Sequence, residues 1–393
     1  MIVIRTLYDV IVIGAGSMGM SAGYHLAMQG VRTLLIDTFD PPHQEGSHHG
    51  ESRLIRHAYH GGPAYVSMAL RAHKLWNELE EATETSLLVQ SGVLNMSSSK
   101  VYSYEERLKD SLQFGVPIEL LDADEIAKRW PGIRLTEDFA GMYEPEAGYL
   151  FSEKCVGAYR QMALAAGATL LPYTRVESIG ADHGGVSVYT QHGVFHAEKA
   201  ILSAGAWFRT LEPFITLPIQ SVRKAVGWFQ SEVPIFDAGN FPGFTLGTVE
   251  GEFYGFPSIG GAGVKIGRHD QGVPWQPGEP IEPFGAYADD EADLRRALET
   301  YMPSAAGGLI RGAVCKYEMT PDEDFIIDHH PAYPNILLAG GFSGHGFKFS
   351  SVVGEILSDL IVKQETTQDI SPFAISRFNN IRKTSFEAGA LWS

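Results

Sequence analysis

The sequence predicts an α/β protein in which a nucleotide-type domain, built from separate parts of the chain, is interrupted by a second domain. Three stretches carry this prediction. A strand, a glycine-rich turn and a helix open the chain over residues 8–28, and a similar set recurs over residues 335–362. Between them, residues 200–207 have the pattern of a buried strand that ends in small residues. Because related elements lie at the start, in the middle and at the end, we expect a discontinuous domain with another inserted into it.

The first of these stretches is a βαβ unit. Residues 8–13 (YDVIVI) form a short apolar run that is typical of a buried strand. After the glycine-rich turn, residues 20–28 (MSAGYHLAM) predict a helix that ends at Gly30, and residues 31–36 (VRTLLI) predict a second strand. Asp37 follows that strand directly, so the unit ends in an acid.

The turn has the spacing of a dinucleotide-binding fingerprint. Gly14 suits a tight turn, Gly16 lets the backbone approach a pyrophosphate, and Gly19 permits close packing of the helix on the strand. The helix N-terminus offers N–H groups and a partial positive charge to phosphates, and Asp37 can accept hydrogen bonds from ribose hydroxyls. We therefore expect the following residues to bind a dinucleotide: Gly14, Gly16, Ser17, Met18, Gly19 and Asp37.

The remaining patterns fill in the two domains. Helical patterns cover residues 65–81, 102–114, 151–166 and 350–362, and short strands are expected at residues 169–171, 176–179, 186–189 and 335–339. Residues 216–315 are rich in aromatic residues and glycine and predict a large antiparallel sheet. We expect residues 1–84, 150–215 and 316–393 to form the cofactor domain, and residues 85–149 and 216–315 to form the substrate domain.

Composition and charge narrow the class of protein. The chain has 393 residues, of which 44% are hydrophobic and 20% charged, and a formal net charge of −17. Such an acidic chain repels phosphate, so we expect no nucleic-acid partner. No apolar run approaches the roughly 20 residues of a membrane span, and the N-terminus lacks the successive regions of a signal peptide. We expect a cytoplasmic protein with no membrane partner.

The chain has two cysteines, Cys155 and Cys315. Their spacing suits neither a metal site nor a disulfide framework, so we expect no metal. Cys155 falls in a predicted helix, where we expect it to be a core residue. Cys315 stands far downstream of the fingerprint, and its neighbours leave two interpretations open: a buried inert thiol, or the point at which a flavin is bonded to the protein.

The fingerprint and its acid do not separate FAD from NAD. The C-terminal strand, glycine-rich turn and helix can deliver further backbone N–H groups to a second part of a cofactor, which favours FAD over a loosely held nicotinamide. An NAD-dependent dehydrogenase nevertheless stays open as an alternative, as does a flavoprotein without catalytic activity.

Seven ordered motifs extend this pattern over nearly the whole chain, at residues 14–19, 46–57, 254–257, 265–269, 312–315, 322–328 and 341–349. With these motifs the chain resembles the monomeric sarcosine oxidase family, which includes N-methyltryptophan oxidase. The resemblance implies a two-domain flavoenzyme of the glutathione-reductase type, with an inserted antiparallel-sheet domain. It also implies FAD bonded covalently through a cysteine sulfur to the flavin 8α carbon. The implied reaction oxidises the N-methyl group of a secondary amino acid with O2, and it yields the primary amino acid, formaldehyde and hydrogen peroxide.

The resemblance assigns roles to residues of this chain. Cys315 corresponds to the flavin-linking cysteine, and Arg56 with Lys348 corresponds to the clamp for the substrate carboxylate. Lys265 corresponds to the oxygen-activating lysine, and His269 to the residue that contacts the substrate amine. The other implied catalytic residues are Arg53, His49 and Tyr317; the other implied substrate-binding residues are Tyr254, Thr245 and Gly344; the other implied cofactor contacts are Ser47, Arg53, Val176, Phe347 and Lys348.

Physical arguments support some of these roles. An arginine fork and a lysine point charge can together hold a carboxylate, and a lysine at the start of a helix opposes the helix dipole, so Lys348 needs a functional reason. Lys265 and His269 alternate in phase on a predicted strand, so both are expected on one side. A fixed cation at Lys265 would stabilise negative charge that develops on oxygen.

The substrate prediction leaves alternatives open. Thr245 stands where sarcosine oxidases carry a methionine. Threonine is smaller than methionine, so it favours a wider pocket, and N-methyltryptophan oxidase resembles this chain at that position. Residues 256–258 and 144–145, in contrast, are closer to sarcosine oxidase. We therefore expect sarcosine and small N-methyl amino acids as substrates of a monomeric enzyme, with N-methyl-L-tryptophan or a cyclic imino acid such as pipecolate or proline as alternatives.

Overall fold

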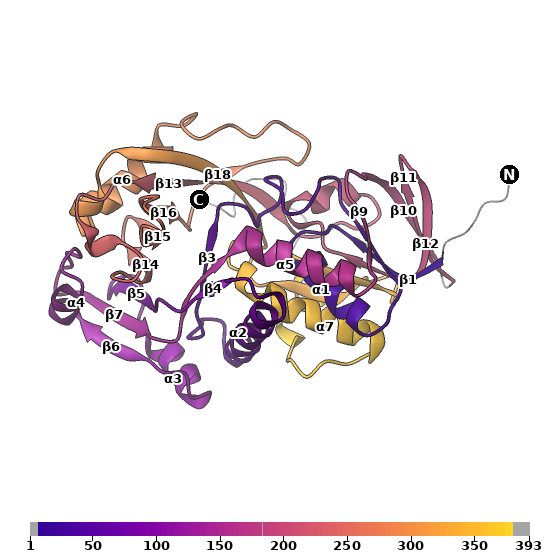
Figure 1. Ribbon diagram of the computed structural model, residues 1–393, viewed down its shortest axis with the longest axis horizontal. Helices are drawn as coiled ribbons and strands as arrows, with labels where there is room; N and C mark the ends of the chain where they lie inside the picture. The colour runs from indigo at the N-terminus through magenta and orange to yellow at the C-terminus, as the bar shows by residue number, and fades with distance from the viewer. Residues whose placement is uncertain (1–6, 183, 380–393) are drawn as a thin grey trace.

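The computed structural model describes residues 7–182 and 184–379, which form two large sheets, one small sheet and the helices that cover them. Figure 1 shows the two large sheets toward opposite ends of the long axis. The main helices are α1 (Ser17–Met28), α2 (Pro63–Thr83), α3 (Glu105–Gln113), α4 (Ala123–Arg129), α5 (Ser152–Ala165), α6 (Asp289–Tyr301) and α7 (Ser350–Val362).

The first large sheet has eight strands and contains the predicted βαβ unit. Its strands are β1 (Leu7–Ile13), β2 (Thr33–Ile36), β9 (Thr169–Leu171), β10 (Val176–Asp182), β11 (Gly185–Thr190), β12 (Gly193–Leu202), β19 (Ile326–His329) and β20 (Ile336–Gly340). β1 lies between β2 and β12 and is parallel to both, and β20 pairs in parallel with the end of β12. The carboxyl ends of β1, β12 and β20 therefore meet at one edge of the sheet.

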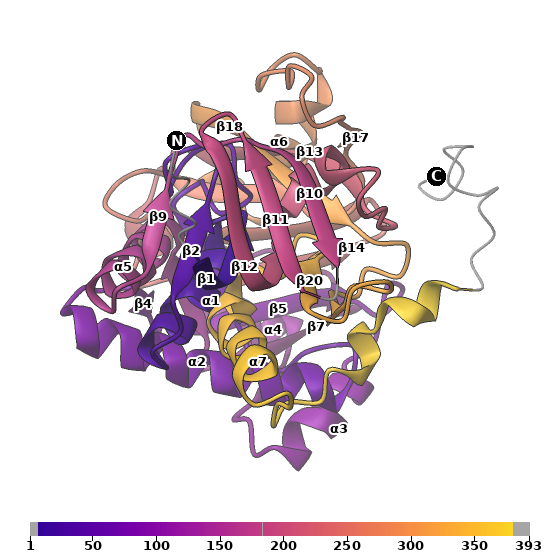
Figure 2. The ribbon, with the colours of Figure 1, turned by 90° about the vertical axis from the view of Figure 1, so that its right-hand side faces the viewer.

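Helices α1, α5 and α7 cover one face of this sheet, as Figure 2 shows. The contact between α1 and α7 is close because both helices present small residues there. Ser21 Oγ donates a hydrogen bond to the main-chain oxygen of Ser351 at 3.3 Å, and Gly354 packs on Ser21. A hydrophobic core of buried residues, among them Cys155, fills the space between these helices and the sheet.

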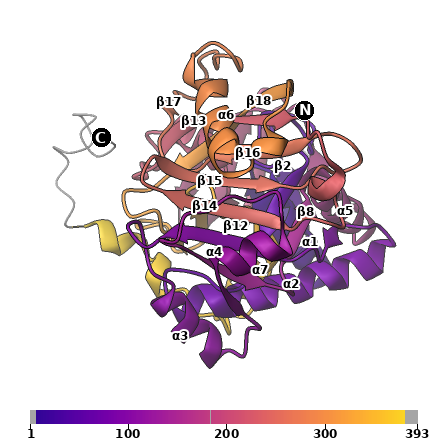
Figure 3. The ribbon, with the colours of Figure 1, turned by 90° about the vertical axis from the view of Figure 1, so that its left-hand side faces the viewer.

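The second large sheet has nine strands and is mostly antiparallel. Its strands are β5 (Val93–Ser98), β6 (Glu119–Asp122), β7 (Phe139–Glu144), β13 (Gln220–Phe229), β14 (Gly243–Thr248), β15 (Gly251–Phe256), β16 (Val264–Arg268), β17 (Val273–Pro274) and β18 (Leu309–Met319). Helices α4 and α6 pack against one face, which Figure 3 views from the front. The large antiparallel sheet expected within residues 216–315 is therefore present, with three strands added from residues 93–144.

A three-stranded sheet completes the described structure. It pairs β3 (Ser52–Ile55) with β8 (Gly148–Phe151), which also pairs with β4 (Leu88–Val89). The short helical turn η1 (Gly205–Leu211) follows β12, and the turn η4 (Phe347–Phe349) precedes α7. No helix within residues 7–182 and 184–379 is both long enough and apolar enough to cross a bilayer.

The element boundaries differ from the predicted ones at three places that affect the argument. α1 begins at Ser17, three residues earlier than expected, so the fingerprint itself contains its first turn. β12 ends at Leu202, and the small residues that follow form a turn instead of continuing the strand. The predicted domain boundary between residues 315 and 316 falls inside β18, which runs on to Met319.

Candidate functional site

Two neighbouring cavities of the described chain share part of their lining. The first cavity, of about 440 Å³, extends from the fingerprint turn past the ends of β2 and β12. The second cavity, of about 650 Å³, lies against β14, β15 and the start of β3. Both are lined by Arg53, Tyr317, Gly344 and Phe347. A ligand in one cavity therefore lies next to a ligand in the other.

The fingerprint glycines of the first cavity have the separate roles that the sequence predicts. Gly14 has a φ of 91°, and a side chain there would collide with the main-chain oxygen of Ser203. A side chain at Gly19 would collide with the main-chain oxygen of Gly14, so this glycine allows α1 to pack on the turn. Gly16 is different, because the nearest atom to an added Cβ, His48 Nδ1, is 3.8 Å away. The open space at Gly16 suits a ligand that approaches the backbone.

Asp37 lies at the end of β2 and holds the fingerprint turn. Its Oδ2 accepts a hydrogen bond from the N–H of Ala15 at 2.8 Å, and its Oδ1 accepts one from the N–H of Phe39 at 2.9 Å. The carboxylate also lines the first cavity. The contact of Asp37 with a ribose stays a prediction, but the carboxylate lies where the dinucleotide geometry requires it.

The polar groups of the first cavity fit a flavin dinucleotide. The hydroxyl of Ser47 is buried and has no hydrogen-bond partner in the described chain, so a ligand can supply one. The first N–H groups of α1 have no partner within the helix and point toward the cavity side of the turn. Val176 and Phe347 line the same cavity, as predicted for cofactor contacts.

Lys316 and Glu318 also line the first cavity and were not predicted as site residues. Lys316 Nζ lies 3.0 Å from Glu45 Oε2. Glu318 accepts a hydrogen bond from the N–H of Gly341 at 3.3 Å, and burial raises the pKa of its carboxyl to about 8. Both residues line the first cavity from β18, the strand that also carries Cys315 and Tyr317.

Three functional groups converge beside Gly50, in the loop before β3. A Cβ at this position would lie 3.6 Å from Arg53 Nη1, 3.8 Å from Cys315 Sγ and 3.9 Å from Lys265 Nζ. Cys315 is only 3% exposed and has no disulfide partner. The thiol predicted to carry the cofactor therefore lies beside the side chains of Arg53 and Lys265.

Arg53 and His49 hold the loop on which this cluster depends. Arg53 Nη2 donates hydrogen bonds to the main-chain oxygens of Ser47 and His49, at 2.8 and 2.6 Å. The two ring nitrogens of His49 lie 2.8 Å from the oxygen of Gly46 and 2.7 Å from the oxygen of Val314. His49 thus connects the loop to β18 one residue before Cys315. Burial lowers the pKa of the imidazole.

Lys265 is buried without a carboxylate partner in the described chain. Its Nζ donates to the main-chain oxygen of Gly50 at 2.5 Å and to both the main-chain oxygen and the hydroxyl of Ser52 at 3.2 Å. The ammonium also lies 4.7 Å from the ring centre of Phe256. Burial, followed by repulsion from Arg53, lowers the pKa of Lys265 to about 7. About half of the Lys265 side chains therefore carry a positive charge at pH 7.

Arg56 and Lys348 face the second cavity and bond only neutral groups of the described chain. Arg56 Nη1 donates to Asn95 Oδ1 at 3.0 Å. Lys348 Nζ donates to the main-chain oxygen of His345 at 2.7 Å and lies 3.5 Å from the hydroxyl of Tyr59. Burial, followed by repulsion from Arg56, lowers the pKa of Lys348 well below its usual value. A carboxylate ligand would relieve this repulsion, because it supplies the missing negative charge.

A buried amide supports Arg56, and sequence reasoning missed it. Asn95 on β5 accepts hydrogen bonds through Oδ1 from Arg56 and, at 3.0 Å, from the hydroxyl of Thr245. Its Nδ2 donates to Glu144 Oε1 at 3.1 Å, and Glu144 in turn accepts from the N–H groups of His57 and Ala58. Thr245, predicted to line the substrate site, therefore also belongs to the support of the clamp.

The second cavity is also lined by four other residues that the sequence predicts for the site: His269, Tyr254, Tyr317 and Gly344. Burial, then the cations Lys224 and Arg56, lower the pKa of His269 to about 3, so its imidazole is neutral at physiological pH. Burial raises the pKa of Tyr254 to about 12. Gly344 has a φ of 76°, and a side chain there would collide with the ring of Tyr317. These four residues are therefore uncharged at physiological pH, although Glu252, Glu323 and Arg107 also line the cavity.

The expectation that Lys265 and His269 lie on one side of a strand stays a prediction. β16 ends at Arg268, so His269 lies in the turn that follows the strand. Lys265 points toward Gly50 and Ser52, whereas His269 lines the second cavity. Lys265 and Cys315 thus lie near Arg53, which lines both cavities, whereas His269, Arg56 and Lys348 line the second cavity. In the described residues, no group of three His, Cys, Asp or Glu side chains is arranged to hold a metal.

Comparisons with known proteins agree with this arrangement. Residues 9–360 match the family described as DAO, the FAD dependent oxidoreductases. The chain is 48% identical over 376 residues to the monomeric sarcosine oxidase of Bacillus sp. (strain B-0618), which covers 95% of this chain and 96% of that protein. It is 40% identical over 373 residues to the N-methyl-L-tryptophan oxidase of Salmonella typhimurium, covering 95% of this chain and 99% of that protein.

A solved structure gives the same fold. The L-proline dehydrogenase from P. horikoshii has a TM-score of 0.83 at 22% identity and covers 96% of this chain and 99% of its own. The resemblance found in the motifs is confirmed by the curated relatives, and the predicted fold class is confirmed by the family and this structure. The chain belongs to the family of FAD-dependent oxidoreductases.

Proposed function

We propose that this protein is an oxidase of N-methyl amino acids, which converts sarcosine and related secondary amino acids to the primary amino acid, formaldehyde and hydrogen peroxide. The observation that carries the proposal is the second cavity, where Arg56 and Lys348 bond only neutral groups of the described chain beside a neutral His269. Two cations without a carboxylate suit the carboxylate of an amino acid. The relatives' printed names supply the reaction class.

The residues in and near the two cavities have different roles in this proposal. Arg56 and Lys348 bind and orient the carboxylate, and Tyr254 and Tyr317 exclude water. His269 holds the substrate nitrogen, and its neutral ring accepts or donates a hydrogen bond without adding charge. The first cavity would hold FAD, which would supply the oxidation of the C–N unit and the transfer of electrons to O2. Lys265 supplies the fixed positive charge that favours the reduction of O2.

The reaction needs the substrate amine without its extra proton. The positive charges of Arg56, Lys348 and Lys224 surround the nitrogen position at His269, and like charges disfavour an ammonium. We therefore expect the rate to rise on the acid side of its profile as the bound amine loses a proton. A flat rate from neutral to alkaline pH, with flavin and fold intact, would contradict this reasoning.

The covalent flavin is a separate part of the proposal. Cys315 is the candidate because its sulfur lies beside two cations at Gly50, whereas Cys155 lies in the core. Acid precipitation tests the link: a yellow pellet whose flavin fluoresces on a denaturing gel indicates a covalent bond. The Cys315→Ser variant should release its colour into the supernatant, and Cys155→Ser is the matched control. Colour in the supernatant of the wild-type protein would refute the link.

A panel of substrates tests the activity. We expect peroxide from sarcosine and N-methylalanine, and the room in a cavity of about 650 Å³ favours N-methyl-L-tryptophan as a second candidate. Pipecolate and proline test the alternative of a cyclic substrate, and glycine, a product, is the negative control. If none of these secondary amino acids reduces the flavin, the proposal fails.

The state and location of the protein are smaller parts of the same proposal. We propose a monomer in the cytoplasm. The word "monomeric" in the name of the Bacillus relative supports the monomeric state. The acidic composition supports the cytoplasmic location. Light scattering during size-exclusion chromatography tests the monomer, since a mass near 86 kDa instead of 43.0 kDa would show a dimer.

A further inference from the structure

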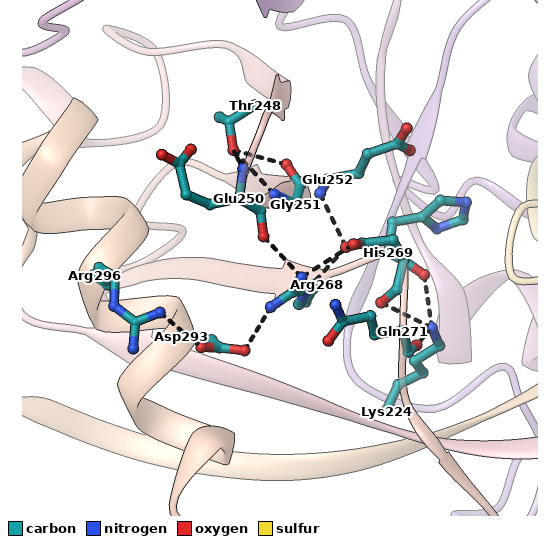
Figure 4. A network of polar contacts seen from close by, with 11 residues as sticks. Lys224, Thr248, Glu250, Gly251, Glu252, Arg268, His269, Gln271, Asp293 and Arg296 are labelled. Atoms are coloured by element: carbon teal, nitrogen blue, oxygen red, sulfur yellow. Dashed lines mark hydrogen bonds and ion pairs between the residues drawn. The ribbon is translucent and has the colours of Figure 1, made fainter. Parts of the chain in front are cut away.

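A buried lysine outside the predicted site holds the turn that carries His269. Lys224 on β13 is only 5% exposed. Its Nζ donates to the main-chain oxygens of His269 and Asp270, at 2.7 and 3.2 Å, and also to the main-chain oxygen of Gln271. Gln271 has a φ of 52°, a left-handed conformation that helps to turn successive carbonyls toward one ammonium. Figure 4 shows Lys224 below this turn.

The other side of the turn is held by β15 and by Arg268. The N–H of His269 donates to the oxygen of Glu252 at 2.7 Å, and the N–H of Glu252 donates to Asp270 Oδ1 at 2.9 Å. Arg268 Nε lies 2.9 Å from Asp270 Oδ1, and its Nη1 lies 2.6 Å from Asp293. The backbone of His269 is therefore fixed on both sides: its N–H by β15, its carbonyl by Lys224.

The imidazole of His269 depends on this backbone. Its ring nitrogens make no hydrogen bond within the described chain, and its ring centre lies 5.8 Å from that of Tyr317. The Lys224 ammonium also lies 5.0 Å from the ring centre of Tyr317. The Lys224 ammonium thus contacts both the turn that carries His269 and the ring of Tyr317. Lys224 itself does not line the second cavity.

We propose that Lys224 is a positioning residue for the reaction: its ammonium fixes the turn at residues 269–271 and thereby places the His269 ring against the substrate nitrogen. The second half of this statement rests on the proposed function, but the first half does not. None of the roles implied by the resemblance falls on Lys224. Its position on a central strand, facing the flavin-linking strand β18, explains how it reaches both walls.

The charge of Lys224 is sensitive to mild alkali. Burial lowers its pKa to about 8, Asp270 and Glu323 raise it in part, and Arg268 lowers it. The other groups that face the ammonium are Tyr317 on β18 and the neutral His269. Above pH 8 the neutral amine keeps fewer and weaker bonds to the three carbonyls. We therefore expect the turn to loosen and the rate of flavin reduction to fall on the alkaline side.

The test compares Lys224→Met and Lys224→Arg in the flavin-loaded enzyme. The control is Lys199→Met, because Lys199 Nζ also donates to a main-chain oxygen, that of Ile361 at 2.6 Å, far from both cavities. Hydrogen exchange of the segment 268–272 should become about 10-fold faster in Lys224→Met, with no change in the control. Flavin reduction should slow by about 10- to 100-fold, and Lys224→Arg should recover most of that loss. Reoxidation by O2, which depends on Lys265, should stay as in the wild type.

Each outcome has one meaning. Unchanged exchange in Lys224→Met overturns the inference, whatever the substrate is. Faster exchange with an unchanged reduction rate makes Lys224 a structural residue and also overturns it. Faster exchange in a protein that oxidises no secondary amino acid refutes the proposed function and leaves the fixing of the turn intact. If Lys224→Met does not fold, the wild type and Lys224→Arg at pH 6.5 and 9 supply the test: exchange of this segment, corrected for pH, should rise in the wild type and stay slow in Lys224→Arg, and an equal rise in both would overturn the inference.

Discussion

Replacing Asn95 by leucine removes the support of the carboxylate clamp without emptying the space. Asn95 is fully buried, and its Oδ1 accepts hydrogen bonds from Arg56 and Thr245 at 3.0 Å each. Its Nδ2 donates to Glu144 at 3.1 Å. Nδ2 also donates to the main-chain oxygen of Met142 at 3.1 Å. Leucine has a similar volume and no polar side-chain atoms, so the variant loses these bonds and leaves four polar groups without their partner.

The size of the effect follows from the charge on Arg56. A hydrogen bond to a charged group contributes about 1.5–3 kcal/mol, and about 1.4 kcal/mol corresponds to a tenfold change in an equilibrium constant. If Arg56 loses its anchor, we expect kcat/KM to fall by about 10- to 100-fold. Most of the change should be in KM, because the clamp binds the carboxylate equally in the ground state and the transition state. The buried Glu144 loses one of its donors, so the free energy of unfolding should fall by about 1–3 kcal/mol.

Oxygen consumption with the preferred N-methyl amino acid measures the first effect, and urea denaturation measures the second. Asn240→Leu is the matched control, because Asn240 is exposed and its Nδ2 donates to the main-chain oxygen of Pro234 at 3.0 Å. It should leave both quantities unchanged. A folded, flavin-loaded Asn95→Leu variant with a KM within about twofold of the wild type would show that Arg56 needs no support from Asn95.

Two further predictions concern Lys265, near Cys315, and Glu318 in the first cavity. Lys265→Met should leave flavin reduction intact and slow reoxidation by O2 by about 100-fold, because a preorganised positive charge is lost; stopped-flow reoxidation at an unchanged rate would contradict this role. Glu318→Gln tests the raised pKa of Glu318. The folded state keeps a proton that the unfolded chain loses above pH 4.5, so the stability of the wild type relative to the variant should fall by about 4 kcal/mol between pH 4.5 and 8. Urea denaturation at pH 5 and pH 8 measures the difference, and a pH-independent difference would refute the buried neutral carboxyl.

Local signals predicted the part of the fold that binds the dinucleotide. The strand, the glycine turn and the helix around Gly14 and Gly19 are adjacent in sequence, and steric limits at those glycines leave few alternatives. Strand pairing over long separations could not be predicted in the same way. β5 of the nine-stranded sheet pairs with β14, about 150 residues later, and no local pattern specifies that neighbour.

The support of the site was missed for the same reason. Asn95 and Lys224 lie inside strands, where a polar residue is usually expected to face solvent. Their partners, Arg56 and the turn after β16, are distant in sequence. A signal was present in Lys224, because it occupies an alternating strand otherwise rich in apolar residues. For His269 the sequence signal is weaker, because β16 ends at Arg268, one residue earlier, and strand alternation alone does not place its side chain.

The charge distribution connects the site to the whole molecule. The chain carries a net charge of −17, yet Arg56, Lys265 and Lys348 are held by neutral oxygens in the described structure instead of by carboxylates. Main-chain carbonyls orient these cations without cancelling their charge, so their field stays available to an anionic ligand. The lowered pKa values of Lys265 and Lys348 measure what this arrangement costs.

A carboxylate in the second cavity should therefore reverse part of that cost. The carboxylate would raise the pKa of Lys348. If it binds at a pH near or above the pKa of the free lysine, Lys348 takes up a proton. Binding would also stabilise the folded protein. Acetate, which has the carboxylate but no amine, isolates this effect from the chemistry. Proton uptake on acetate binding that disappears in Lys348→Met would tie it to the clamp, whereas uptake that persists would place the titrating group elsewhere.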